Sequence, residues 1–220
     1  MVLPSVMSAA VLIFGLSACG GGDDEKAEPS LTASQVCDST LDSSATSALQ
    51  RVGRTKKFTE LPGTNDSGES NVFSLERATK TTHEDATQRN QCVVFKAGDE
   101  GGHPLINIDF SAAKSAPSPD SSTEDKDSDQ AFYSMGVYAK SNGNVSATLY
   151  FKCQTQAPDT SNNSTPYIRS SLTSAGQLSA GTTGRELMTI LNSVSRAMAK
   201  ELDCASQAAL PAQVPDVEAQ

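Results

Sequence analysis

Residues 131–153 read AFYSMGVYAKSNGNVSATLYFKC, and this stretch decides the fold. It holds two alternating apolar runs on either side of Asn142-Gly143, a dipeptide typical of a tight turn between antiparallel strands. A two-residue loop and a three-residue loop both fit this turn. We expect a three-residue loop over 142–144 that pairs Ala139 with Ala147, because this register gathers the apolar side chains on one face. The side chains expected on the other face are those of Lys140, Thr148 and Lys152.

Further strands are expected from short runs of apolar and β-branched residues. The clearest is the run in which Ile106, Ile108 and Phe110 alternate with polar residues, as in a strand with one buried face. The full set of expected strands outside the hairpin is 57–61, 72–77, 91–96, 104–110 and 166–173.

Two helices are expected, one near each end of the chain. The first spans 32–53, with a capping box at Thr32-Ala33-Ser34-Gln35 and Gly53 as its C-cap. The second follows the capping box Thr183-Gly184-Arg185-Glu186 and carries an apolar stripe over 187–202. We therefore predict an α+β fold in which an antiparallel sheet is flanked by an N-terminal and a C-terminal helix.

The N-terminal part of the chain has the composition of an export signal followed by a tether. Residues 5–18 carry no charge and are mostly apolar, and the following GGGDDEKAEPS has no apolar periodicity. We expect a signal peptide over 1–18, a flexible tether over 19–31, and one domain over 32–204. That domain contains a polar, acidic loop at 114–130, and we expect residues 205–220 to form a loosely ordered tail.

Leu16-Ser17-Ala18-Cys19 resembles the lipobox of bacterial lipoproteins. The resemblance implies that the chain is cut before Cys19, that the Cys19 thiol is diacylated, and that the domain is held at the outer face of the cell membrane. Met1–Ser5 contains no lysine or arginine, so either the true translation start lies upstream or the signal is atypical, and we expect the first.

Two longer segments extend this resemblance. VCDSTLDSSATSALQRVGRTKKF and RAMAKELDCASQAALP look like segments of uncharacterised lipoproteins from streptomycetes and related actinobacteria. The resemblance implies an envelope location and paired cysteines. It supplies no catalytic residues.

The cysteines predict two disulfides. The chain has five, and lipidation of Cys19 leaves an even number, which in an exported protein indicates disulfide pairing. Four cysteines allow three connectivities, and the mirrored order of helix and strands in the two halves of the chain favours Cys37–Cys92 and Cys153–Cys204. No C-x-x-C pair is present, so we expect no metal site.

Charge and motifs argue against several functions. A net charge of -9 argues against binding to nucleic acid. Ser111-Ala112-Ala113-Lys114 matches the S-x-x-K nucleophile motif of β-lactamases, but no K-T-G follows it. Asp125-Lys126-Asp127-Ser128-Asp129 begins like a calcium loop, but Gln130 stands where that loop requires glycine. His83 and His103 lie in polar surroundings, so we expect no enzyme and no cofactor.

These observations predict a lipid-anchored extracytoplasmic lipoprotein that acts as a non-catalytic binding or interaction module. One alternative is a carrier that holds a lipid or another small hydrophobic ligand in an apolar cleft. A second alternative is an envelope hydrolase that uses His83 or His103. The expected partners are the cytoplasmic membrane, through the lipid on Cys19, and an envelope protein or small hydrophobic molecule.

Overall fold

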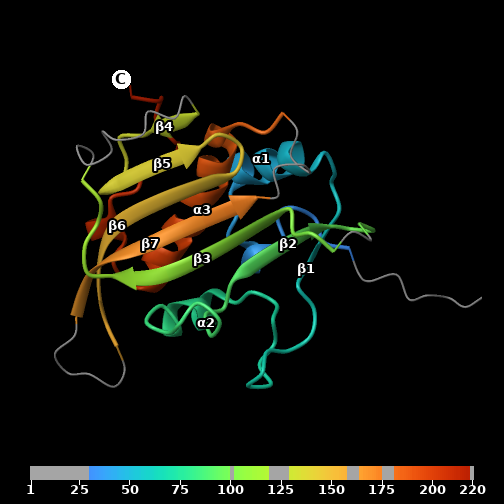
Figure 1. The fold of residues 1–220 in the computed structure, drawn as a ribbon, viewed down its shortest axis with the longest axis horizontal. Helices are drawn as coiled ribbons and strands as arrows, with labels where there is room; N and C mark the ends of the chain where they lie inside the picture. Colours follow the sequence, from blue (N-terminus) through green and yellow to red (C-terminus); the bar gives the residue numbers. More distant parts are fainter. Residues whose placement is uncertain (1–29, 100–101, 119–128, 158–163, 175–180, 219–220) are drawn as a thin grey trace, which may run out of the picture.

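The structure, a computed structural model, describes residues 30–99, 102–118, 129–157, 164–174 and 181–218 (Figure 1). The expected signal peptide, Cys19, most of the tether and most of the acidic loop lie outside the described residues.

Seven strands of the described chain form one antiparallel sheet. They are β1 (Phe58–Glu60), β2 (Cys92–Lys96), β3 (Ile106–Ala113), β4 (Gln130–Phe132), β5 (Tyr138–Asn142), β6 (Ser146–Gln156) and β7 (Ser164–Ser174). Their order across the sheet is β1-β2-β3-β7-β6-β5-β4, so the two halves of the chain meet where β3 pairs with β7. The strands expected at 57–61, 91–96, 104–110 and 166–173 are confirmed.

Helices cover one face of this sheet. In Figure 1 the sheet lies in front of α1 (Ser43–Gly53) and α3 (Gly184–Glu201), which pack against each other and, through α3, against β5, β6 and β7. The short helices are η1 (Cys37–Ser39), α2 (Leu75–Lys80) and α4 (Ala205–Ala208). The predicted α+β class is therefore confirmed. No helix among the described residues has the length and apolar character needed to cross a membrane.

The hydrophobic core lies between the sheet and the two long helices. Along β6 from Ser146 to Cys153, every second side chain is buried while its neighbours are partly or fully exposed, which is the pattern of a strand with one covered face. The opposite face of the sheet has no helix over it in the described chain (Figure 1). The buried side chains of β6 are Ala147, Leu149, Phe151 and Cys153.

The register of the β5–β6 hairpin corrects the prediction. Ala139 pairs with Leu149 rather than with Ala147, so the pairing is displaced by two residues. The loop still has three residues, but it runs over 143–145 and not over 142–144. Because side chains alternate with a period of two, a two-residue displacement leaves the faces unchanged. Lys140, Thr148 and Lys152 therefore lie on the face opposite the core, as expected.

The first helix begins later than predicted. Gln35 accepts a hydrogen bond from the backbone nitrogen of Thr32 at 2.9 Å, but this contact closes a turn and not a helix. Cys37, Asp38 and Ser39 then adopt left-handed conformations, with φ of 52°, 56° and 56°, which interrupt any continuous helix. The left-handed residue at the end of α1 is Arg54, not Gly53.

The stretch 72–77, expected as a strand, lies partly in helix α2. Ser74 is its N-cap and accepts from the Arg77 nitrogen at 3.4 Å. Glu76 and Lys80 form an i,i+4 ion pair at 2.6 Å on its exposed side. The apolar run is too short to separate strand from helix by periodicity, and these local polar contacts favour the helix.

The second long helix and both disulfides are confirmed. Thr183 and Glu186 form a reciprocal capping box at the start of α3. Cys37 is bonded to Cys92, and Cys153 to Cys204. Each disulfide ties a segment on the helical side to a strand: Cys92 lies in β2 and Cys153 in β6.

The tail is packed where it is described, contrary to the expectation of loose order. Val214 is buried, and Arg185 donates to the carbonyl oxygens of Val214 and Pro215 at 2.8 and 3.0 Å. Val217 forms a bridge with Tyr133 beside β4. At the other edge of the sheet, Leu31 exchanges two hydrogen bonds with Phe58 of β1. Segments near the two ends of the described chain therefore cover the outer edges of the sheet.

Candidate functional site

The outward face of β5, β6 and β7, called here the bare face, is the first candidate site. Tyr138, Tyr150 and Arg169 stand in one row across the three strands, and Lys140 and Thr148 stand in the next. Its outward side chains are Tyr138, Lys140, Asn142, Ser146, Thr148, Tyr150, Lys152, Tyr167, Arg169, Ser171 and Thr173.

The bare face is positively charged, although the whole chain carries a net charge of -9. Strands β5, β6 and β7 contain Lys140, Lys152 and Arg169 and no aspartate or glutamate. The acidic residue Asp109 of β3 is paired with Arg89 at 2.9 Å. The three cations of the bare face therefore have no carboxylate partner within these strands.

Aromatic rings line the same face. The rings of Phe132 and Tyr138 are 6.1 Å apart, and those of Tyr138 and Tyr150 are 6.0 Å apart, both edge to face. The Lys140 ammonium lies 5.7 Å from the centre of the Phe132 ring. Burial, and secondarily Tyr150, raises the pKa of Tyr138 above its ordinary value, so its hydroxyl stays protonated at neutral pH.

A hollow of about 270 Å³ lies on the bare face. Its lining includes the two cations Lys140 and Arg169 and the two rings Tyr138 and Tyr150. The side chains of Asn142, Ser146 and Thr148 complete its polar lining, and none of them forms a hydrogen bond with another described residue.

A second pocket, of about 370 Å³, lies on the helical side between α3, α4 and the residues just before α1. Its lining is mixed, with Arg196 and Lys200 beside Leu210 and several alanines. Its inner wall is a polar network that joins the two long helices. Ser193 of α3 accepts from the Asp42 nitrogen at 2.9 Å and donates to the Thr40 carbonyl at 3.0 Å.

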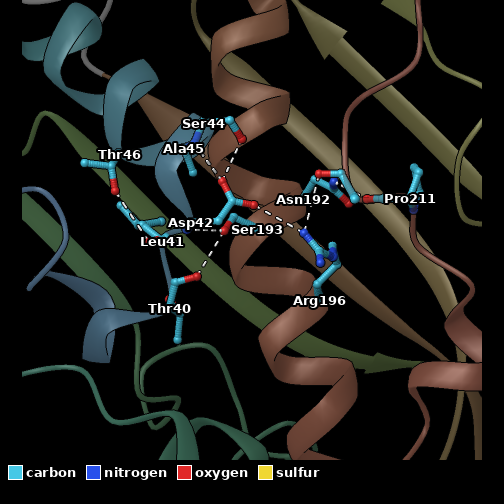
Figure 2. Close-up of polar contacts among 11 residues, drawn as sticks. Thr40, Leu41, Asp42, Ser44, Ala45, Thr46, Asn192, Ser193, Arg196 and Pro211 are labelled. Atoms are coloured by element: carbon cyan, nitrogen blue, oxygen red, sulfur yellow. Dashed lines mark hydrogen bonds and ion pairs between the residues drawn. The ribbon is translucent and has the colours of Figure 1, made fainter.

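Figure 2 shows Asp42 between the first turn of α1 and Arg196 of α3. Its carboxylate accepts from the nitrogens of Ser44 and Ala45, each at 3.0 Å, and from Arg196 at 3.2 Å. Partial burial opposes ionisation of Asp42, but these hydrogen bonds and the Arg196 charge prevail and hold its pKa below the usual value. The carboxylate is therefore a structural N-cap whose contacts account for this wall of the pocket.

Replacement of Asp42 by alanine is expected to lower the free energy of unfolding by about 1–2 kcal/mol, the usual loss for an N-cap. Asp42→Asn is the matched control, because asparagine still caps α1 but cannot pair ionically with Arg196. The pair is half-exposed, so this variant should lose less than about 0.5 kcal/mol. Urea unfolding at pH 7 measures both values, and an equal loss in the two variants would contradict the capping role.

The Asp42 carboxylate also predicts how the stability of the fold changes with pH. Because the folded pKa of Asp42 lies below 3.8, its contribution is complete above that pH and is lost as the pH falls through the folded value. Between pH 5 and pH 3 the wild type should therefore lose more stability than Asp42→Asn.

The histidines do not lie in a hydrolase arrangement in the described chain. His83 Nε2 is 3.0 Å from the hydroxyl of Thr155, which in turn is 2.9 Å from that of Thr165. Burial lowers the pKa of His83 below its usual value, so the ring is neutral at pH 7. His103 is exposed, and Ser111 lies inside β3 rather than at a helix start.

One buried carboxylate lies beside a disulfide. Glu60 accepts from the backbone nitrogens of Cys37 and, at 3.1 Å, Phe73. Burial raises the pKa of Glu60 above its ordinary value, although both hydrogen bonds act in the opposite direction. Glu60, Cys37 and Cys92 bring three possible metal ligands together, but the two sulfurs are bonded to each other and neither is a thiolate. This cluster therefore supports the turn at 37–39.

Sequence reasoning placed Lys140, Thr148 and Lys152 on one face but missed the residues of β7 that complete the site. The alternation around Ile168 could have placed them, because a buried Ile168 puts Tyr167 and Arg169 on the outward face of β7. Only the pairing of β6 with β7 shows that they join the same surface. Comparisons of the chain with protein-family models, with curated proteins and with solved structures find no match.

Proposed function

We propose that this protein is a lipid-anchored, non-catalytic binding module at the outer face of the cell membrane, and that it binds its ligand on the bare face. The observation that carries this proposal is the segregation of charge. Three cations and no carboxylates stand on β5, β6 and β7 in a chain whose net charge is -9. One solvated face is normal for an antiparallel sheet, but such a face needs no separation of charge sign.

The position of the tether supports the same function. The lipobox-like Cys19 precedes the domain, and the domain begins where Leu31 pairs with Phe58 of β1. In the sheet order, β7 is three strands from β1, or roughly 14 Å at the usual strand spacing of about 4.8 Å. A chain anchored through Cys19 would thus hold the bare face away from its attachment edge and open to a ligand.

The pocket between α3 and α4, with its alanines and Leu210, is a structural candidate for the carrier alternative. The core between sheet and helices is already filled by the protein's own side chains, among them Phe151, Met188 and Leu191 with no exposed area. A hydrophobic cargo would therefore bind at the helical side, on the opposite face of the sheet from Lys140 and Arg169.

Native mass spectrometry of the full chain, purified in detergent from membranes of its own host, tests the proposal. We expect a bound mass that is released on denaturation. It should be lost in the double variant Lys140→Gln, Arg169→Gln and kept in Lys56→Gln, whose exposed lysine lies outside the bare face. A mass that stays in the double variant, or a wild type that carries only acyl chains, contradicts binding at the bare face.

A separate variant tests the lipid anchor at Cys19. Cys19→Ala should move the protein from the membrane fraction to the soluble extracytoplasmic fraction, because diacylation supplies the two chains that stable attachment needs. Retention of this variant in washed membranes would contradict the anchor.

A further inference from the structure

We infer that the hollow on the bare face is a subsite for an acidic sugar, a pyranose ring that carries a carboxylate. This inference rests on the proposed function, because it names the chemistry of the ligand bound at that same face. Three kinds of group converge on the hollow: cations, neutral polar side chains and aromatic rings. The three match, in turn, the carboxylate, the hydroxyls and the C–H faces of such a ring.

The cations supply the preference for an anion. Lys140 and Arg169 come from β5 and β7, with β6 between them, so they approach the hollow from two sides. Neither forms an ion pair with a described residue. Arginine can hold a carboxylate through two parallel hydrogen bonds, and such charge-assisted bonds are stronger than neutral ones.

The neutral polar groups supply the match to hydroxyls. Asn142, Ser146 and Thr148 each offer both donor and acceptor atoms, and their side chains are free within the described chain. A compact anion such as phosphate would use only donors. A ring with several hydroxyls uses both kinds, and this set of side chains fits it better.

The rings supply an apolar wall. The rings of Tyr138 and Tyr150 pack edge to face with their centroids 6.0 Å apart, and this contact favours the same orientation before any ligand arrives. At about 270 Å³ the hollow is slightly smaller than the usual ligand pocket, which suits a single ring as one unit of a longer chain.

The sheet argues against an acidic peptide as the occupant. An extended peptide gains affinity mainly by adding a strand to a free sheet edge. β5, β6 and β7 each have a paired strand on both sides, so their backbone groups are already engaged under the hollow. A peptide would have only side-chain contacts there.

Isothermal titration of the full chain in detergent micelles with trigalacturonate tests the inference. We expect binding that weakens about tenfold in each of Arg169→Gln and Lys140→Gln, the size of one lost charge-assisted hydrogen bond. Lys56→Gln should bind like the wild type. Maltotriose, a neutral chain of the same number of rings, should bind at least tenfold more weakly than trigalacturonate. Tyr150→Ala should weaken binding of both sugars.

A peptide of six glutamates separates failure of this inference from failure of the proposed function. Binding of the peptide as tightly as trigalacturonate, with the same loss in Arg169→Gln, overturns the sugar assignment and leaves the bare face as the binding surface. Equal binding of maltotriose and trigalacturonate also overturns it, because the cations would then confer no preference for a carboxylate. Absence of binding by every probe, together with a wild type that shows no bound mass in native mass spectrometry, overturns both.

Discussion

Replacement of Cys153 and Cys204 together by alanine is expected to lower the free energy of unfolding by about 4 kcal/mol. The cysteines are 51 residues apart, and the loop-closure entropy of a loop of that length corresponds to about 4 kcal/mol at 25 °C. Both cysteines are buried, with Cys153 on the interior strand β6 and Cys204 just beyond α3. The bond thus ties the end of α3 to an interior strand of the sheet.

The second disulfide is the matched comparison. Cys37 and Cys92 are 55 residues apart, so entropy alone predicts nearly the same loss for Cys37→Ala, Cys92→Ala. We expect a smaller loss, because Cys37 begins a run of three left-handed residues without glycine. Each such residue is strained by about 1–2 kcal/mol, and without the bond this turn can relax.

Urea unfolding of both double variants, followed by circular dichroism at 25 °C, measures the two losses. A Cys153–Cys204 variant within 1 kcal/mol of the wild type would contradict the predicted cross-link effect. A greater loss in the Cys37–Cys92 variant would contradict the strain argument for the turn.

The features that could be predicted from the sequence are those that depend on local periodicity. The alternation in 104–110 and in 146–153 predicted the buried faces correctly, and the box at Thr183 predicted the start of α3. Register escaped prediction, because both an offset of two residues and the expected pairing bury the same side chains. Periodicity determines which face of a strand is buried, but it does not determine which residue of the neighbouring strand lies opposite each position.

The errors fall where tertiary contacts override local preference. Residues 37–39 turn left-handed where Cys37 is bonded to Cys92 and its nitrogen donates to Glu60, and neither partner is visible in the local sequence. The residues of the candidate site are likewise brought together by contacts between segments that are distant in the sequence. Its lysines could be placed on one face of the hairpin, but Arg169 joins them only through pairing of β6 with β7.

Replacement of Gly136 by alanine is expected to lower the free energy of unfolding by about 4 kcal/mol, although it adds a single methyl group. Gly136 has φ of 61°, and a Cβ there would lie 2.4 Å from the Tyr150 carbonyl oxygen and 2.9 Å from Leu149 Cδ1. That carbonyl accepts from the Val137 nitrogen at 2.7 Å. The backbone of β6 would have to move, and this hydrogen bond would break.

Gly68→Ala is the control, because Gly68 has φ of 78° and no atom within 4 Å of an added Cβ. It should lose only about 1–2 kcal/mol, the cost of the left-handed conformation itself. The difference between the two variants, measured by thermal and urea unfolding, isolates the clash with the Tyr150 carbonyl. Equal losses would mean that β6 yields at little cost, and the ring of Tyr150 would then not be held in place for a ligand. A large difference would show that the backbone beneath the hollow is rigid, which is the condition that a preformed binding surface requires.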